Sequence, residues 1–326
     1  MTNENITALE ANGFNRWTKG NMDRLYINAR DLGLVCSYYK TGNISAAYFN
    51  GESISNSQGY RYKAAKTFID IKTGIIYSDY PALKEAAEKS GKKLMVMRNN
   101  RYMQVSSYLK KYIEAGKMGE IYCGRCGWQR RRGIPGKGGW FTTKEQSGGG
   151  PLIDLGVHMI DLAVWLMGNP TPVAVSANTY TKFADNDTSD SENSKFGDAK
   201  SEGTFDVEDL AMGMIRFDNG AVLQIEFSWA SNIKAENRFV ELRGTKAGLK
   251  WEDNEVEFFT EEDGQLLDIK PTGNMESDGH KKNIRNFIDV LTEGAEPVFK
   301  PSQGVDMIKI LCAIYESAEK GKEVIL

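Results

Sequence analysis

Hydrophobic and polar positions alternate with a two-residue period through much of the chain after Glu120, and this pattern predicts antiparallel strands. The predicted strands are EIYCGRCGW, VAVSANTYTKF, LAMGMIRF, AVLQIEFSWAS and NRFVELRG. Asp218-Asn219-Gly220 stands between two of them and is typical of a tight hairpin turn. Helical spacing at HKKNIRNFIDVLTEG and GVDMIKILCAIYESAEKG predicts two further helices. We therefore expect a strand-rich, antiparallel C-terminal part with helices.

The stretch from residue 81 to 119 has a different pattern. PALKEAAEKSGKK predicts a helix that ends at Gly91, KKLMVM predicts a short buried strand, and VSSYLKKYIEAGKMG predicts a second helix. This order is that of one piece of an α/β sheet. Because such sheets bind ligands beyond the carboxyl ends of their strands, Asn99, Asn100 and Arg101 are candidate cofactor-binding residues.

Residues 1–80 form a separate segment, rich in aromatic residues, with short strand-like runs such as RLYINA and KTFIDIKTGIIYS. Turn signals follow these runs at TGN, NGE and KTG. We predict a small, mostly β module with one short helix near SQGYRYKAAK, and we assign it no function. The predicted domains are therefore residues 1–80 and residues 81–326.

Composition narrows the class of protein. A length of 326 residues suits about two domains, and a net charge of −3 argues against a nucleic-acid or membrane-surface role for the whole chain. The start, MTNENITALEANGF, lacks the basic and apolar pattern of a signal peptide, and the longest apolar run is too short to span a bilayer. Four cysteines do not make a disulfide framework. We expect a cytoplasmic protein without a membrane partner.

Two further motifs have plain interpretations. The segment from Phe183 to Asp209 holds nine acidic residues and is predicted to be a solvated loop, since the oxygen spacing of a calcium loop is absent. Cys123 and Cys126 form a CGRC motif inside a predicted strand, where residues three apart point to opposite faces. We therefore interpret both thiols as structural, with neither a redox nor a zinc role, and we predict no metal site.

The stretch SGGGPLIDLGVHMIDLAVWLMG predicts a largely buried helix that begins after three glycines. Asp154, His158 and Asp161 lie within about 60° of one another on such a helix. One interpretation is a buried His–Asp pair that holds the helix in place. The other is a general acid/base, with the imidazole oriented by a carboxylate one turn away. Spacing alone favours the structural interpretation.

The same stretch resembles the signature helix of the Gfo/Idh/MocA oxidoreductases, which are NAD(P)-dependent enzymes acting on sugars and polyols. The resemblance extends over most of residues 81–326, through YIEAGKMGEIY, GWQRRRGIPGKGGWFTTKEQSGGG, FDVEDLAMGMIRFDNGA and HKKNIRNFIDVL. It implies an α+β fold in which a large open antiparallel sheet carries helices on one face. Residues 81–119 would then be the remnant of a dinucleotide domain. The resemblance also implies a homo-oligomer that pairs through the open face of the sheet.

The resemblance assigns roles to single residues. His158 matches the catalytic base that takes a proton from the substrate hydroxyl, and Asp154 matches the carboxylate that binds this hydroxyl. Asp161 is placed beside the substrate with this pair. The loop RRRGIPGKGGWF matches a substrate-side wall whose candidate contacts are Arg130, Arg131, Arg132 and Trp140. Solvated arginines and a packed tryptophan are the alternative for this loop.

Two expected motifs are missing. The chain has no Gly-x-Gly-x-x-Gly turn between a strand and a helix, and no Glu-Lys-Pro motif with its lysine. The implied cofactor, NAD or NADP, is therefore left without its usual cradle. Two hypotheses stay open: a sugar or polyol dehydrogenase of impaired activity, or an inactive sugar-binding or assembly module. The second includes a non-functional product of gene fusion or truncation near residue 80.

Overall fold

The computed structural model describes residues 84–85, 87–89, 91, 93–184, 199–253, 255–272 and 278–326, together with the backbone of seven strands between residues 14 and 77. The chain divides into two compact units. One contains residues 1–99 and 278–302, and the other contains residues 100–277 and 303–326.

The first unit begins with strands, as its sequence pattern predicts. Five of them form an antiparallel sheet in chain order, and the last two pair as a hairpin. The strands are β1 (Phe14–Lys19), β2 (Met22–Ala29), β3 (Leu34–Tyr39), β4 (Ile44–Phe49), β5 (Glu52–Ser53), β6 (Phe68–Ile69) and β7 (Ile76–Tyr77). The short helix predicted near residues 57–66 lies outside the described residues.

The rest of the first unit corrects one prediction. The short buried strand predicted at KKLMVM, residues 92–97, is not formed: residues 93–97 pair with no strand among the described residues and are at most half-buried. The physical reason is that a strand exists only through its hydrogen-bonded neighbours. The segment is instead held by helix α6 (Gly279–Thr292), where the buried Asn283 accepts a hydrogen bond from the Arg98 N–H at 3.1 Å.

The second unit contains one nine-stranded sheet with the order β15-β14-β13-β12-β8-β11-β10-β9-β16. Its strands are β8 (Ile121–Gln129), β9 (Pro172–Tyr180), β10 (Leu210–Phe217), β11 (Val222–Ser228), β12 (Asn237–Gly244), β13 (Ala247–Glu252), β14 (Glu255–Glu262), β15 (Gln265–Ile269) and β16 (Val324–Ile325). All neighbours are antiparallel except β8 and β11, which run parallel. The predicted antiparallel sheet is therefore a mixed one.

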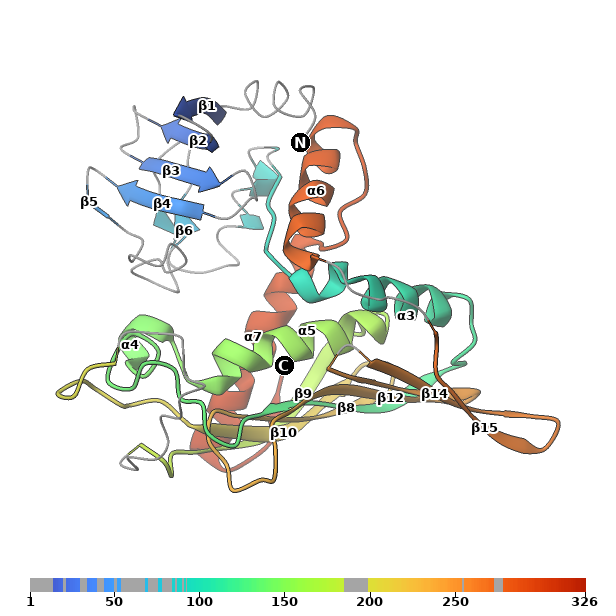
Figure 1. Cartoon of the computed structure of the whole chain (residues 1–326). Helices are drawn as coiled ribbons and strands as arrows, with labels where there is room; N and C mark the ends of the chain where they lie inside the picture. Colours follow the sequence, from blue (N-terminus) through green and yellow to red (C-terminus); the bar gives the residue numbers. More distant parts are fainter. Residues whose placement is uncertain are drawn as a thin grey trace. The chain divides into compact units, whose positions relative to one another are not determined.

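Helices cover one face of this sheet (Figure 1). They are α3 (Gln104–Glu114), α5 (Val157–Leu166) and α7 (Pro301–Lys320), and the short helices η2 (Asn99–Tyr102) and α4 (Lys144–Ser147) precede α3 and α5 in the chain. Alternate residues of the central strands, such as Leu223, Phe227 and Leu242, are fully buried beneath them. The opposite face carries Met212 and Met214, each 38% exposed. The α+β prediction, with helices on one face, is confirmed.

Two local features complete the fold. The predicted hairpin turn joins β10 to β11, where Gly220 has φ +84° and donates to the Phe217 carbonyl at 3.0 Å. The helical stretch Lys144–Leu166 is long and apolar enough to cross a membrane by length and composition, but 72% of its apolar window is buried inside the protein. Burial of that extent is typical of a core helix.

Candidate functional site

The helix that carries Asp154 and His158 does not begin as a regular α-helix. Its first turn, Leu152–Gly156, is π-helical, and α5 continues from it without a break. Such π turns are uncommon and occur frequently at functional sites. Asp154 lies in the π turn and His158 in the first turn of α5, and both side chains are half-buried.

The glycine-rich turn before this helix is bound by a buried carboxylate. Glu208, which is 6% exposed, accepts hydrogen bonds from the backbone N–H groups of Gly150 (3.0 Å) and Leu152 (3.2 Å). Tyr315 of α7 donates its hydroxyl to the same carboxylate at 2.9 Å. Burial raises the pKa of the Glu208 carboxyl, although the hydrogen bonds oppose this effect. Glu208 thus supplies the helix start with the acceptor that its free N–H groups need.

The close approach of Glu208 and Tyr315 explains two of the three glycines. A Cβ on Gly149 would collide with the Tyr315 hydroxyl, and a Cβ on Gly150 would collide with the Glu208 backbone carbonyl. Any larger residue would therefore push the helix start away from β10 and α7.

The carboxylate of Asp154 has a defined partner. Trp229, directly after β11, donates its indole N–H to Asp154 Oδ2 at 3.0 Å, and the tryptophan is fully buried. The Trp229 ring also meets Phe141 edge to face at 6.3 Å, and Phe141 meets Trp140 in the same way at 5.3 Å. The predicted substrate-side residue Trp140 is thus linked to Asp154 through a row of aromatic rings.

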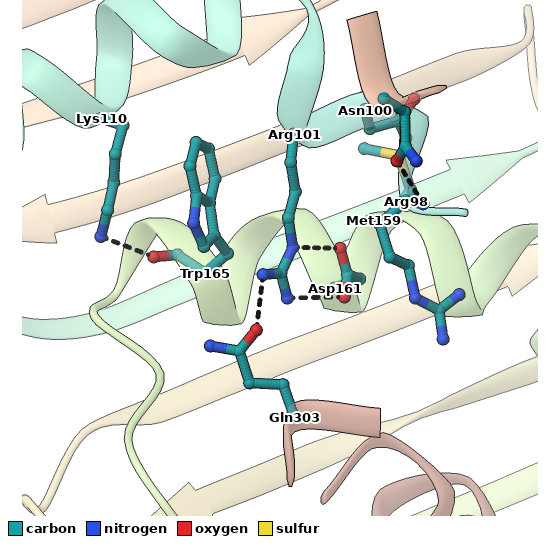
Figure 2. Close-up of polar contacts among 9 residues, drawn as sticks. Arg98, Asn100, Arg101, Lys110, Met159, Asp161, Trp165 and Gln303 are labelled. Atoms are coloured by element: carbon teal, nitrogen blue, oxygen red, sulfur yellow. Dashed lines mark hydrogen bonds and ion pairs between the residues drawn. The ribbon is translucent and has the colours of Figure 1, made fainter. Parts of the chain in front are cut away.

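The structure places Asp161 elsewhere. Its two oxygens accept hydrogen bonds from Arg101 at 2.7 and 2.8 Å, and the two side chains are 3% and 2% exposed (Figure 2). Arg101 also donates to Gln303 Oε1 at 2.7 Å. The predicted contact between Asp161 and a substrate stays a prediction. The ion pair argues against it, because Arg101 already occupies both carboxylate oxygens.

The candidate cofactor residues are not grouped around an open cradle. Arg101 is engaged by Asp161, and Asn100, 9% exposed, directs its amide nitrogen to Met159 Sδ at 4.0 Å (Figure 2). Asn99 begins helix η2 and is half-buried. These contacts are of the kind that hold a fold together.

The three candidate arginines tie two segments together. Arg130 lies 3.5 Å from Glu236, and Arg131 donates to the Lys234 carbonyl at 3.2 Å. Arg132 donates to the Ser231 carbonyl at 2.9 Å. All three therefore make contacts with residues 231–236, which follow β11, and substrate binding by them stays a prediction. Trp140 differs, because its indole nitrogen is buried and has no hydrogen-bond partner among the described residues.

The acidic segment needs one correction. Residues 185–198 lie outside the described residues, but the last part of the predicted solvated loop is ordered against the site. Asp209, 1% exposed, accepts from the N–H groups of Lys182 and Phe183 at 2.5 Å each, and burial raises the pKa of its carboxyl. Sequence reasoning missed Glu208 and Asp209 because their acidic neighbours masked them. Their position directly before a predicted strand was the available signal.

The remaining candidates for chemistry are few. Cys126 is buried, and its burial raises the pKa of the thiol, whereas Cys123 is half-buried, and both are free cysteines. No group of three His, Cys, Asp or Glu side chains that could hold a metal ion occurs in the described part of the chain. The pair that remains is Asp154 and His158. A half-buried imidazole that shares a helix with a carboxylate is a candidate acceptor for the proton of a bound hydroxyl.

Comparison with known proteins gives this arrangement a context. Residues 110–326 match the Gfo/Idh/MocA group described as "Oxidoreductase family, C-terminal alpha/beta domain". The chain is 32% identical over 241 residues to D-glucoside 3-dehydrogenase of Escherichia coli (strain K12), covering 74% of this chain and 66% of that relative. It is 31% identical over 163 residues to levoglucosan dehydrogenase of Pseudarthrobacter phenanthrenivorans, covering 48% and 41%. It thus spans less than two thirds of these relatives.

Solved structures show the same fold. Levoglucosan dehydrogenase in complex with NADH and L-sorbose superposes with a TM-score of 0.64 at 24% identity, over 76% of this chain and 69% of that one. An oxidoreductase domain protein from Kribbella flavida gives a TM-score of 0.63 at 20% identity, over 76% and 70%. At these identities the likeness establishes the architecture.

Proposed function

Because the chain belongs to the Gfo/Idh/MocA oxidoreductase family, we propose that residues 81–326 are the substrate domain of a sugar or polyol dehydrogenase. Relatives are named for a D-glucoside, for levoglucosan and for scyllo-inositol, three polyhydroxylated rings. We extend this substrate class to the chain. We assign no function to residues 1–80.

One observation carries the proposal: Asp154 and His158 lie half-buried on the same helix, and a buried tryptophan fixes the carboxylate. Asp154 accepts a hydrogen bond from a ring hydroxyl of the substrate. His158 is the general base that removes the proton from the reacting hydroxyl. Trp140, which is half-buried, offers a ring face to the sugar.

The described residues do not fit a nicotinamide dinucleotide. A dinucleotide needs backbone N–H groups at a helix N-terminus after a glycine turn. Asn100 and Arg101, the residues predicted for this role, are buried in contacts with Met159 and Asp161. We therefore derive no hydride-transfer step. The proposal covers the binding of the sugar, and His158 would remove the hydroxyl proton only where a hydride acceptor is bound as well.

A second candidate is a sugar-binding or assembly module without redox activity. The absence of the glycine fingerprint and of the Glu-Lys-Pro lysine from the sequence favours it. The two candidates share the sugar site and differ only in whether the chain also takes up NAD or NADP.

The open face of the sheet supports a proposal about assembly. Tyr180, Met212 and Met214 are 38–41% exposed there, on neighbouring strands β9 and β10. We propose that two copies of a cytoplasmic protein pair through this face. Light scattering should give twice the mass of one chain, and Met214→Glu should reduce it.

Two titrations test the proposed function. Calorimetry with methyl β-D-glucoside, levoglucosan and scyllo-inositol should show saturable binding of at least one, at roughly millimolar concentration or below. His158→Ala should weaken this binding but leave the thermal midpoint of unfolding nearly unchanged. If none of the three binds, the sugar site is wrong.

The second titration follows nicotinamide fluorescence with NADH and NADPH. Saturation at roughly micromolar cofactor would establish the dehydrogenase and overturn the binding module. Sugar binding without any cofactor response would establish the module.

A further inference from the structure

Trp229 occupies a position that packing alone does not explain. It is fully buried, and a buried tryptophan needs a partner for its indole N–H. Most such partners are backbone carbonyls or waters. Here the acceptor is Oδ2 of Asp154 at 3.0 Å, the carboxylate of the candidate site.

The indole is held in place from other directions. The Trp229 backbone N–H donates to the Asp209 carbonyl at 2.9 Å, which fixes the chain where β11 ends. Its ring meets Phe141 at 6.3 Å with an interplanar angle of 86°, and Phe141 meets Trp140 at 5.3 Å and 87°. The hydrogen bond to Asp209 holds the Trp229 backbone, and the contact with Phe141 holds its ring. Together they direct the indole N–H towards Asp154.

Asp154 needs such a partner because of where it lies. It stands in the π turn Leu152–Gly156, outside the regular part of the helix, so the backbone around it differs from that of α5. His158 follows four residues later, in the first turn of α5, on the same continuous helix.

We propose that Trp229 is a positioning residue, which orients the Asp154 carboxylate beside His158 and connects it to the substrate-side ring of Trp140. The inference rests on the proposed role of Asp154 as the contact for the sugar hydroxyl. A hydrogen bond donated to a carboxylate is among the stronger hydrogen bonds in proteins, and it holds the carboxylate in one direction. In this proposal the Asp154 carboxylate binds the sugar hydroxyl, and the fully buried Trp229 sets the direction of that carboxylate without contacting the sugar.

The test uses the fact that the chain has only two histidines, His158 and His280. In protein labelled with ¹⁵N-histidine, Trp229→Phe should shift the imidazole signals of His158 and leave those of His280 in place. The matched control is Trp251→Phe, which also removes a fully buried indole, one whose nitrogen has no partner among the described residues. Trp251→Phe should lower the free energy of unfolding about as much as Trp229→Phe does, but it should leave the imidazole signals of His158 in place.

A second measurement covers the case in which Trp229→Phe does not fold. In protein labelled with ¹⁵N-tryptophan, Asp154→Asn should shift one of the six indole N–H signals, that of Trp229, more than the other five. Unmoved His158 signals in Trp229→Phe, equal shifts in Trp229→Phe and Trp251→Phe, or an unchanged indole signal in Asp154→Asn would each overturn the proposal.

The readouts separate this inference from the proposed function, because the two labelling experiments need neither sugar nor turnover. With levoglucosan, methyl β-D-glucoside or scyllo-inositol as the probe, Trp229→Phe should weaken binding by about tenfold or more relative to Trp251→Phe. If the wild type binds no sugar while His158 still responds selectively, the proposed function fails and the positioning role stands. If the sugar binds Trp229→Phe as tightly as wild type, the positioning role fails.

Discussion

Arg101 donates two hydrogen bonds to the carboxylate of Asp161, at 2.7 and 2.8 Å, and the ion pair is almost completely excluded from water. Arg101 comes from helix η2 and Asp161 from α5, so the bond connects the helix of the candidate site to the segment that precedes α3. The same guanidinium also donates a hydrogen bond to Oε1 of Gln303, on α7, at 2.7 Å. Three segments far apart in sequence therefore meet at one buried cation.

We predict that breaking this pair destabilises the protein strongly. Asp161→Asn leaves the Arg101 guanidinium buried without a counter-charge, which should cost about 3–5 kcal/mol in urea unfolding. The double variant Arg101→Met with Asp161→Leu should recover much of this loss, because both charges leave together. The control is Glu323→Gln at the exposed Arg216–Glu323 pair, which should cost less than about 1 kcal/mol. An Asp161→Asn loss as small as that of the control would contradict the prediction.

The example shows what the sequence could and could not predict for the site. Helical spacing correctly placed Asp154, His158 and Asp161 on one helix, but the partner of each carboxylate comes from another part of the chain. Asp154 meets Trp229, seventy-five positions later, and Asp161 meets Arg101, sixty positions earlier. Periodicity holds no information on such long-range contacts, so one polar stripe was expected where the structure has two separate bonds.

The pH dependence of stability should report the buried Glu208. Its carboxyl has an ordinary pKa of 4.5, which burial raises in the folded protein. Such a group stabilises the folded state most at a pH below its pKa in the unfolded chain. This contribution is lost as the pH rises through its pKa in the folded protein. Relative to Glu208→Gln, the wild type should therefore lose stability as the pH rises above the ordinary value of 4.5. Urea unfolding across this range measures the difference.

Glu241 gives a control of opposite sign. Burial raises the pKa of its carboxyl, but hydrogen bonds from Arg125 and Arg243 outweigh this effect and lower it. A carboxyl with a lowered pKa stabilises the folded protein at a pH above its pKa in the unfolded chain. This stabilisation is lost as the pH falls through the pKa in the folded protein. Glu241→Gln should thus differ from wild type most at neutral pH. If the two variants show slopes of the same sign, our assignment of Glu208 is wrong.

The glycine turn before the site makes a prediction about shape. Gly150→Ala should destabilise by about 1–3 kcal/mol, since its Cβ would meet the backbone carbonyl of Glu208, which cannot give way. Gly149→Ala should cost a similar amount in wild type but less in a Tyr315→Phe background, because the Tyr315 hydroxyl is the atom that comes nearest to the new Cβ. Thermal melting of the single and double variants measures this coupling.

The control for this series is Gly248→Ala, where the new Cβ would make only ordinary contacts, the nearest at 3.4 Å from Phe259. Its cost should stay below about 1 kcal/mol. If the stability losses of Gly149→Ala and Tyr315→Phe add up in the double variant, the Tyr315 hydroxyl is not the reason that position 149 requires a glycine.

The fold was predictable where a strand alternates clearly and hard to predict where it does not. The patterns of β8 to β12 predicted five strands, because one residue in two is buried beneath the helices. β13 carries the same signal in Ala247, Leu249 and Trp251 but is short. β14 is rich in glutamate, and β15 is largely exposed. The parallel pairing of β8 with β11 and the π turn depend on neighbours in space, which local pattern does not contain.

The CGRC motif leads to a prediction about thiol reactivity. Cys123 and Cys126 both lie on β8, but only Cys126 faces the buried side, and its burial raises the pKa of the thiol. Since the thiolate is the species that reacts, iodoacetamide should modify Cys123 and the exposed Cys312 in the native protein, and Cys126 roughly a hundredfold more slowly. Mass spectrometry of a Cys36→Ser chain before and after unfolding in urea measures the three rates. Oxidant should form no Cys123–Cys126 bond, because the two side chains point to opposite faces of the strand. Equal rates for Cys123 and Cys126, or a disulfide between them, would require the redox interpretation of the motif.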